Sequence, residues 1–158
     1  MPEISFKTPL GSCAIGWEAD EITGFWLPPA EDRGVLAPPW VDAIIERVRG
    51  HLAGDVQDFS DVPYAWQRVS VFQRRVYAAA LGVKAGQTMT YGRLAAITGF
   101  AATPRAVGAA LCHNPWPLLV PCHRFIGADG RMTGFSAPGG IKTKLRLLAL
   151  EGAEFFAE

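Results

Sequence analysis

The sequence has little cysteine and no long apolar run. Its 158 residues include three cysteines, Cys13, Cys112 and Cys122, which form an odd and scattered set. Such a set is a poor disulfide framework and favours a reducing compartment, which we expect to be the cytoplasm, or the nucleus if the source is eukaryotic. No apolar run approaches the roughly 20 residues that a membrane span requires. The N-terminal stretch lacks a basic region followed by an apolar core, so we expect no signal peptide.

The chain also lacks net charge, internal repeats and low-complexity tracts. Its 15 basic and 15 acidic side chains cancel, but they are unevenly placed. Residues 1–71 hold 5 basic against 11 acidic side chains, and residues 72–158 hold 10 against 4. This asymmetry suggests two units, of which the second is suited to a polyanion such as nucleic acid. The alternative is that both signs are solvated surface and that the two halves merely attract each other.

The first half, which we expect to form a domain over residues 1–68, has the pattern of a small sheet with one helix. Residues 11–29 predict two apolar strands around a turn at residues 18–21. Residues 40–54 predict a helix that ends at Gly54. Its apolar face comprises Val41, Ile44, Ile45, Val48 and Leu52. The polar, turn-rich residues 54–70 are then expected to carry the chain to a second domain, residues 69–158.

The second half predicts several short helices. Residues 71–83 place Phe72, Val76 and Ala80 in helical register. Residues 90–99 predict a helix with Leu94 and Ile97 inward and Gly99 at its end. The next helix begins at Thr103, a good N-cap, followed by Pro104 at the first helical position. The last, over residues 139–152, has Ile141, Leu145 and Leu148 as its apolar face and Gly152 as its stop.

Two short helices joined by a tight turn, at residues 90–112, are typical of a helix-turn-helix. Arg105 lies at the exposed start of the second helix, among the small residues Ala106 and Gly108. A recognition helix usually offers several long polar side chains to base edges, whereas this helix offers one arginine. Such a smooth surface permits close approach to a DNA backbone without reading sequence. The alternative is a helix rich in alanine and glycine that packs tightly on a neighbour.

Residues 128–131, "ADGR", predict a hairpin between two short strands, which could form a wing beside the helices. Glu151 follows at the end of the last helix, where a carboxylate is unfavourable to the macrodipole. We therefore expect Glu151 to have a partner.

Cys122 and His123 are adjacent in the stretch "LLVPCHRF", residues 118–125. A thiol reacts as its thiolate and has a pKa of about 8.5 when free, so it needs a base or a positive field. His123 is a candidate base, and Glu151 is a candidate to orient it. Adjacent residues of an extended chain point to opposite sides, so a tight turn or a bridging water must link them. Asn114 could hold such a turn, and prolines 115, 117 and 121 would stiffen it.

Three other interpretations of these residues stay open at this point. Cys122 could be an inert buried thiol. The pairs Cys112–His113 and Cys122–His123 could bind zinc, although their spacing fits zinc signatures badly. A cysteine–histidine hydrolase could use the same dyad, but that hypothesis explains neither Arg105 nor the helix-turn-helix pattern.

Five segments of the second half resemble one known family, the methylated-DNA–protein-cysteine methyltransferases, also called O6-alkylguanine-DNA alkyltransferases. They are "TYGRLA", "PRAVGAAL", "NPWPLLVPCHR", "GFSAPGG" and "LLALEG". They occur in the family's order across about residues 70–152. The first half is only weakly similar, although residues 8–27 fit the family's strand pair.

The resemblance implies a fold and a reaction. The fold would be an α/β ribonuclease-H-like N-terminal unit followed by a mostly α winged helix-turn-helix unit. The protein would bind double-stranded DNA as a monomer, flip an O6-alkylguanine out of the helix and move the alkyl group to its own cysteine, once per molecule. O4-alkylthymine would be a further substrate. No cofactor is implied, and a related non-enzymatic class binds such lesions without transfer but lacks the acceptor cysteine.

The resemblance also implies roles for individual residues. Cys122 would accept the alkyl group, His123 would take its proton through a water, and Glu151 would orient His123. Asn114 would brace the turn, and Tyr91 would donate a hydrogen bond to the leaving guanine.

Further residues match the family's DNA contacts and base pocket. Arg105 would fill the space that the flipped base leaves. The other DNA-contacting positions are Thr90, Ala106 and Gly108. The pocket positions are Leu111, Phe125, Phe135, Ser136 and Lys144.

Three departures from the family's pattern bear on the pocket and on metal binding. Phe135 replaces the tyrosine of many members, and Phe125 is bulkier than the usual valine. Some members bind zinc in the first half, but here that half has only Cys13 and His51, so we expect no metal.

Overall fold

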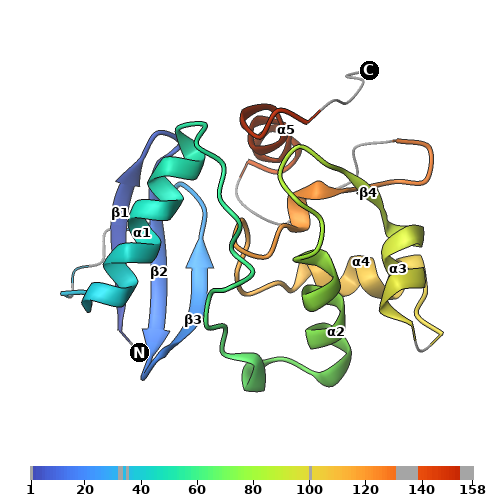
Figure 1. Cartoon of the computed structure of the whole chain (residues 1–158), viewed down its shortest axis with the longest axis horizontal. Coiled ribbons are helices and arrows are strands. Elements are labelled where there is room, and N and C mark those ends of the chain that lie inside the picture. The colour runs from blue at the N-terminus through green and yellow to red at the C-terminus, as the bar shows by residue number, and fades with distance from the viewer. Residues whose placement is uncertain (1, 32–33, 35, 100, 131–138, 154–158) are drawn as a thin grey trace.

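The computed structural model describes residues 2–31, 34, 36–99, 101–130 and 139–153 of the chain. It is a mixed α/β structure (Figure 1). The described residues contain an antiparallel three-stranded sheet of order β1-β2-β3, made by β1 (Glu3–Thr8), β2 (Gly11–Glu18) and β3 (Glu21–Trp26). The predicted pair β2 and β3 is confirmed. β1 was missed, although Ile4 and Phe6 alternate with polar residues in a strand pattern.

Helix α1 (Pro39–Leu52) packs on one face of this sheet (Figure 1). The five apolar side chains of its predicted face are all buried, together with His51. The helix ends near the predicted stop, and Gly54 then takes a positive φ of 101°, a conformation that glycine adopts without steric cost. We call β1–β3 with α1 the sheet unit.

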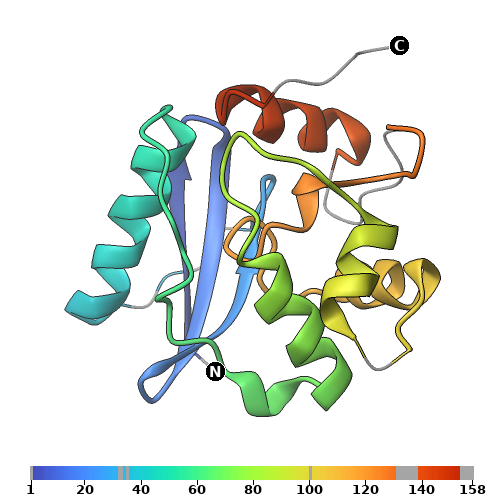
Figure 2. The same cartoon turned by 45° about the vertical axis from the view of Figure 1, so that its right-hand side comes forward.

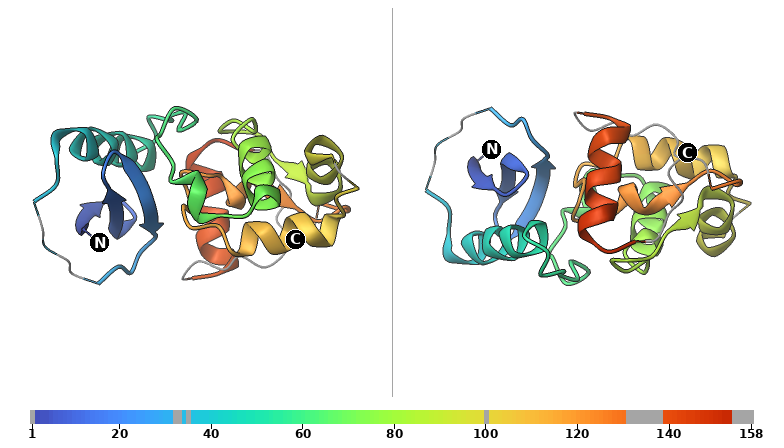
Figure 3. Two further views of the ribbon diagram at one scale, coloured as in Figure 1. Left: turned by 90° about the horizontal axis from the view of Figure 1, so that it is seen from below. Right: turned by 90° about the horizontal axis from the view of Figure 1, so that it is seen from above.

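The remaining elements form a second, mostly helical group, which we call the helical unit. Figures 2 and 3 show it beside the sheet unit. Its elements are η1 (Trp66–Arg68), α2 (Val71–Ala80), β4 (Met89–Thr90), α3 (Tyr91–Thr98), α4 (Pro104–Cys112), η2 (Cys122–Arg124), β5 (Phe125–Ile126) and α5 (Ile141–Leu150). Side-chain caps begin several helices: Ser70 accepts from Gln73 N, Thr90 from Arg93 N, and Thr103 from Ala106 N.

Two predicted helix faces are wrong in detail. Ile97 of α3 and Ile141 of α5 were expected inward, yet they are 55% and 42% exposed. The buried side chains of α3 are Leu94, Ala95 and Thr98, and those of α5 are Lys144, Leu147 and Leu148. Helices of eight and ten residues carry more than one apolar stripe, and the neighbours they pack against decide which one is buried. Leu145 and Phe72 are half-buried.

The predicted hairpin is described in part. Its turn is present, since Gly130 N donates to Gly127 O at 3.0 Å. β5 pairs in parallel with β4. The expected second strand falls on residues 131–138, outside the described residues.

The two units share one apolar core, which includes the fully buried Trp116. The indole ring of Trp116 packs against Tyr64, Trp66 and Tyr77 at centroid distances of 5.1, 5.5 and 6.1 Å. Its Nε1–H donates to Ile22 O of β3 at 2.9 Å. Phe25 N of the same strand donates to Pro115 O at 3.0 Å. The segment that leads to Cys122 is therefore fastened to the sheet. None of the helices in the described part of the chain is long and apolar enough to cross a membrane.

Candidate active site

A braced turn delivers Cys122 and His123. The side chain of Asn114 bonds the backbone twice: Nδ2 donates to Val120 O at 3.0 Å, and Oδ1 accepts from Trp116 N at 2.9 Å. Between these contacts Leu118 takes a φ of 78°, a strained left-handed conformation for a side-chain-bearing residue. Asn114 therefore holds the turn, as the sequence predicted. The chain then enters the 3-10 turn η2. In this turn Cys122 and His123 do not point to opposite sides of the chain, as they would in an extended segment.

His123 is held by Glu151. Its Nε2 lies 3.0 and 2.9 Å from the two carboxylate oxygens. Because a carboxylate only accepts hydrogen bonds, Nε2 carries the hydrogen, and the neutral ring keeps its lone pair on Nδ1. Nδ1 is buried and has no hydrogen-bond partner among the described residues. Burial holds the pKa of His123 below its usual value, although Glu151 opposes that shift. The ring is therefore a neutral base with one open nitrogen.

Glu151 follows α5 as its C-cap and is buried. Besides His123, it accepts hydrogen bonds from His51 at 2.8 Å and from Arg124, whose Nε and Nη2 lie 3.0 and 2.8 Å from Oε1 and Oε2. Burial disfavours its charge, but the hydrogen bonds from His123, His51 and Arg124 outweigh burial and hold its pKa far below the usual range. The expectation that this carboxylate has a partner is confirmed.

Sequence reasoning missed His51 and Arg124 as members of this cluster. Arg124 is the last residue of the tetrapeptide "PCHR", but sequence reasoning assigned it no role next to the cysteine and the histidine. His51 had a detectable signal, because it shares the buried face of α1 with Ile44 and Val48. A polar side chain on an apolar helix face must find a hydrogen-bond partner.

Cys122 is a protonated thiol at rest. Burial raises its pKa to about 11, against the opposing influence of a hydrogen bond from Asn114 and the positive charge of Lys144. The side chain is 6% exposed. At neutral pH the proton must therefore leave as the sulfur reacts, which calls for a base. His123, the next residue in the same turn, is the candidate.

Lys144, Tyr91, Phe125 and Gly108 come together from four elements. Lys144 is fully buried, its Nζ donates to Phe125 O, and it lies 5.9 Å from the centroid of the Tyr91 ring. A Cβ built on Gly108 of α4 would lie 3.9 Å from Cδ1 of Tyr91. Burial lowers the pKa of Lys144 to about 8, while the two cysteines Cys122 and Cys112 favour its charge.

Leu111 is buried on α4. Of the predicted pocket residues, Phe135 and Ser136 lie outside the described residues.

The predicted DNA-contacting residues lie on α3 and α4, which pack against each other (Figure 2). Arg105 is exposed in the first turn of α4, Ala106 and Gly108 of the same helix are half-buried, and Thr90 caps α3. α4 thus offers a small-residue surface with a single long cation near its start.

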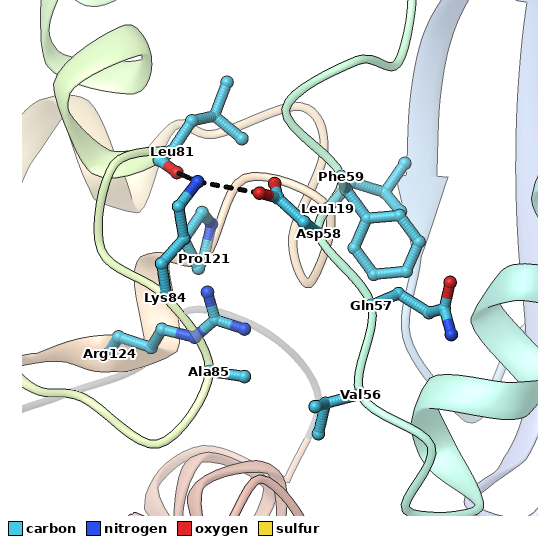
Figure 4. Close-up of a pocket in the computed structure, with 10 residues that line it drawn as sticks. All are labelled: Val56, Gln57, Asp58, Phe59, Leu81, Lys84, Ala85, Leu119, Pro121 and Arg124. Atoms are coloured by element: carbon cyan, nitrogen blue, oxygen red, sulfur yellow. Dashed lines mark hydrogen bonds and ion pairs between the residues drawn. The ribbon is translucent and has the colours of Figure 1, made fainter.

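A cavity of about 300 Å³ lies between residues 56–59, in the segment that follows α1, and residues 81–85 of the helical unit (Figure 4). Lys84 crosses it to Asp58 at 2.9 Å and also donates to Leu81 O. Arg124 lines the same cavity and donates to Val83 O at 2.7 Å. The charged side chains named here that line the cavity therefore already form hydrogen bonds or ion pairs with one another or with the backbone.

Within the described residues, no group of three or more histidine, cysteine, aspartate or glutamate side chains is placed to hold a metal ion. Nδ1 of His113 lies 2.9 Å from Ala109 O, and His123 is held by Glu151. The zinc interpretation of the two cysteine–histidine pairs gains no support from this arrangement.

The fold and the site together define a class of protein: a sheet unit joined to a helical unit, with a buried thiol that is followed directly in sequence by an imidazole held by a carboxylate. Residues 71–153 match a family model described as "6-O-methylguanine DNA methyltransferase, DNA binding domain". The methylated-DNA–protein-cysteine methyltransferase of Mycobacterium tuberculosis is 34% identical over 152 residues, covering 93% of this chain and 90% of that protein. The chain belongs to this methyltransferase family.

Two further similarities bear on function. A protein of Thermus thermophilus named "DNA base-flipping protein" is 44% identical over 108 residues, covering 68% of this chain and 71% of that protein. The crystal structure of Mycobacterium tuberculosis OGT in complex with DNA superposes with a TM-score of 0.80 at 32% identity, covering 94% of this chain and 92% of that chain.

Proposed function

We propose that this protein repairs alkylated DNA directly, by moving the alkyl group of an O6-alkylguanine, or of an O4-alkylthymine, to Sγ of Cys122. The observation that carries the proposal is the buried cluster in which Glu151 fixes the hydrogen on Nε2 of His123 and leaves Nδ1 open. Membership of the methyltransferase family supports the reaction type. Cys122 is the nucleophile because its thiolate is soft and strong enough to displace guanine from carbon.

The residues divide the chemistry between them. The thiol proton passes through a water to Nδ1 of His123, and Glu151 stabilises the imidazolium that forms. A C–S bond forms as the bond between O6 and the alkyl carbon breaks, and Tyr91 donates a hydrogen bond to the departing guanine. The thiol loses one proton and the guanine gains one, so the step needs no cofactor. The thioether is stable, so each molecule reacts once.

DNA binding is assigned to the helical unit. We take α3, its turn and α4 as a winged helix-turn-helix, and the sheet unit as ribonuclease-H-like. Arg105 would enter the space left by the flipped base, while Thr90, Ala106 and Gly108 would approach the backbone. Lys144, Leu111, Phe125, Phe135 and Ser136 would line the base pocket. The excess of basic side chains in residues 72–158 suits duplex DNA, and we expect the protein to bind it as a monomer.

An intact-mass experiment tests the proposal. The protein is incubated with duplex DNA that carries one O6-methylguanine, and peptide mapping locates any added methyl group. We expect one methyl on Cys122 and none in Cys122→Ser. Cys112→Ser is the matched control, because Cys112 is an exposed thiol at the end of α4, and it should react like the wild type. Methylation at Cys112 instead would refute the assignment.

A second candidate function is lesion binding without transfer. The similarity to the DNA base-flipping protein of Thermus thermophilus favours keeping it in the test. The presence of Cys122, followed in the same turn by a histidine that Glu151 holds in place, argues against lesion binding alone. Binding to the alkylated duplex with no gain in mass would support this candidate. Repeated turnover of an ester or amide would instead point to a hydrolase.

A further inference from the structure

The buried cluster at Glu151 reaches across the two units. Glu151 ends α5 of the helical unit, and His51 lies in the last turn of α1, 100 residues earlier in the sequence. Both side chains are fully buried, and Nε2 of His51 lies 2.8 Å from Oε2 of Glu151. The sheet unit has no role in the proposed reaction as described above. It nevertheless contributes a hydrogen bond to Glu151, the carboxylate that holds His123.

The hydrogen position of His51 follows from its other contact. The backbone N–H of Gln57 donates to Nδ1 of His51 at 2.9 Å. A backbone N–H can only donate, so Nδ1 is unprotonated and Nε2 carries the hydrogen. The ring of Phe59 packs against the imidazole at a centroid distance of 5.4 Å. His51 is thus a rigid, neutral donor aimed at Glu151.

The neutral state of the His51 ring matters for the proposed proton transfer to His123. Arg124 already supplies one positive charge to Glu151 through both carboxylate oxygens. A second cation at position 51 would further offset the negative charge that must stabilise His123 once it is protonated. A neutral donor fixes the carboxylate without that effect. Oε2 then receives hydrogen bonds from His51, His123 and Arg124, which leave it little freedom to turn away.

We propose that His51 is a positioning residue for the transfer reaction, and that through it the sheet unit sets the geometry of the base. It holds Oε2 of Glu151 where the carboxylate keeps the hydrogen of His123 on Nε2 and the lone pair on Nδ1. This inference rests on the proposed function for the identity of the electrophile. It does not rest on it for the reactivity of Cys122, which can be measured without DNA.

Two substitutions of His51 introduce the same amide group but differ in whether that amide can reach Glu151. The amide nitrogen of His51→Gln falls near the place of the imidazole Nε2, whereas that of His51→Asn falls near Nδ1 and cannot reach Glu151. In a Cys112→Ser background, the rate at which iodoacetamide alkylates Cys122 is followed by peptide mass from pH 6 to 10. We expect His51→Asn to be about ten- to a hundredfold slower near neutral pH, with its profile shifted to higher pH, and His51→Gln to stay close to wild type. The same order is expected for methyl transfer from DNA.

The dependence of the alkylation rate on pH reports how readily Cys122 loses its proton, which also depends on the charged groups around it. Lys144 influences the thiol, while His51, Arg124 and Glu151 surround His123. Each of these neighbours except His51 is unchanged in the variants, so a shift in the profile belongs to the His51–Glu151 contact. Equal rates for His51→Asn and His51→Gln would overturn the proposal.

Lys84→Ala is the matched control for a purely structural tie. Lys84 of the helical unit pairs at 2.9 Å with Asp58 of the segment that follows α1 (Figure 4), but this ion pair is half-exposed and does not include Glu151. We expect wild-type rates in Lys84→Ala. If its rates fall as far as those of His51→Asn, His51 merely ties the units together and the proposal fails.

Nitrogen NMR of the wild-type protein gives a test that needs no variant. The ring of His51 should show the tautomer with hydrogen on Nε2, and a hydrogen on Nδ1 would contradict the proposal. If the wild-type protein fails to take methyl groups from DNA but the iodoacetamide rates follow the expected order, the proposed function is wrong and the role of His51 stands.

Discussion

At the scale of single residues, the site combines a thiol that is protonated at rest with a base that is neutral at rest. Burial raises the pKa of Cys122 to about 11 and lowers that of His123. Both shifts disfavour a thiolate–imidazolium pair before substrate arrives, which protects an irreplaceable sulfur from adventitious oxidation and alkylation. In the proposed reaction, Glu151 would stabilise the imidazolium and Lys144 would stabilise the thiolate once charge develops.

Tyr91 provides a prediction at this scale. The ring lies near both Lys144 and Gly108, and its hydroxyl is the proposed donor to the leaving guanine. We expect Tyr91→Phe to slow single-turnover transfer by about ten- to a hundredfold, because one hydrogen bond to the developing charge is lost. Affinity for alkylated duplex should change little. An unchanged rate in rapid-quench measurements would remove Tyr91 from the mechanism.

At the scale of elements, α4 does two things at once. Its buried face, Val107, Ala110 and Leu111, joins the core, and its small residues leave an accessible surface around Arg105. Thr103 caps the helix and Pro104 begins it, so local sequence fixes where Arg105 lies in the first turn. Nothing else on this surface offers the long polar side chains of a sequence-reading helix.

Arg105 provides the prediction at this scale. If its planar guanidinium replaces the flipped base in the stack, Arg105→Ala should slow repair of duplex DNA at least tenfold, because flipping costs a few kcal/mol of unstacking. Reaction with free O6-benzylguanine should be unaffected. Arg105→Lys keeps the charge without the plane and should restore only the electrostatic part of duplex affinity. Equal losses on the duplex and on the free base would contradict the stacking role.

At the scale of the whole molecule, the buried cluster links chain segments that are far apart in sequence: α1, η2 and the end of α5. The division into domains at residues 68 and 69 stays a prediction, and the shared core around Trp116 means that the two units stabilise each other. Removing a partner from a buried charged cluster costs far more than breaking a surface ion pair.

Acid stability tests this linkage. The folded-state pKa of Glu151 lies below its unfolded value of about 4.3, and that of His123 lies below about 6.5. Both groups therefore contribute stability at neutral pH, and the protein should lose stability as the pH falls below about 6.5 for His123 and below about 4.3 for Glu151. Urea unfolding from pH 7.5 to 3 measures the decline.

A variant isolates the contribution of Glu151. We expect Glu151→Gln to lower the free energy of unfolding at pH 7 by about 3 kcal/mol, since Arg124 keeps a buried charge without its partner. The difference from wild type should shrink below about pH 4, where the unfolded wild-type carboxylate is protonated. Glu46→Gln is the control, because Glu46 is exposed on α1, and it should change stability little at any pH. A pH-independent difference for Glu151→Gln would argue against the linkage.

The sequence by itself determined the local features. Strands β2 and β3, the apolar face of α1 and the caps of α3 and α4 follow from patterns a few residues long, because backbone propensity and side-chain caps act over that range. The same holds for the turn braced by Asn114, whose partners lie within six residues. The resemblance in residues 70–152 supplied the assignment of Cys122, His123 and Glu151.

Tertiary packing decided what local patterns leave open. It turned Ile97 and Ile141 outward, because a short helix buries the stripe that its neighbours cover. It also brought His51 to Glu151 across 100 residues and set Lys144 beside Tyr91. Such contacts depend on how whole elements meet, and a buried polar group finds its partner only when that packing is complete.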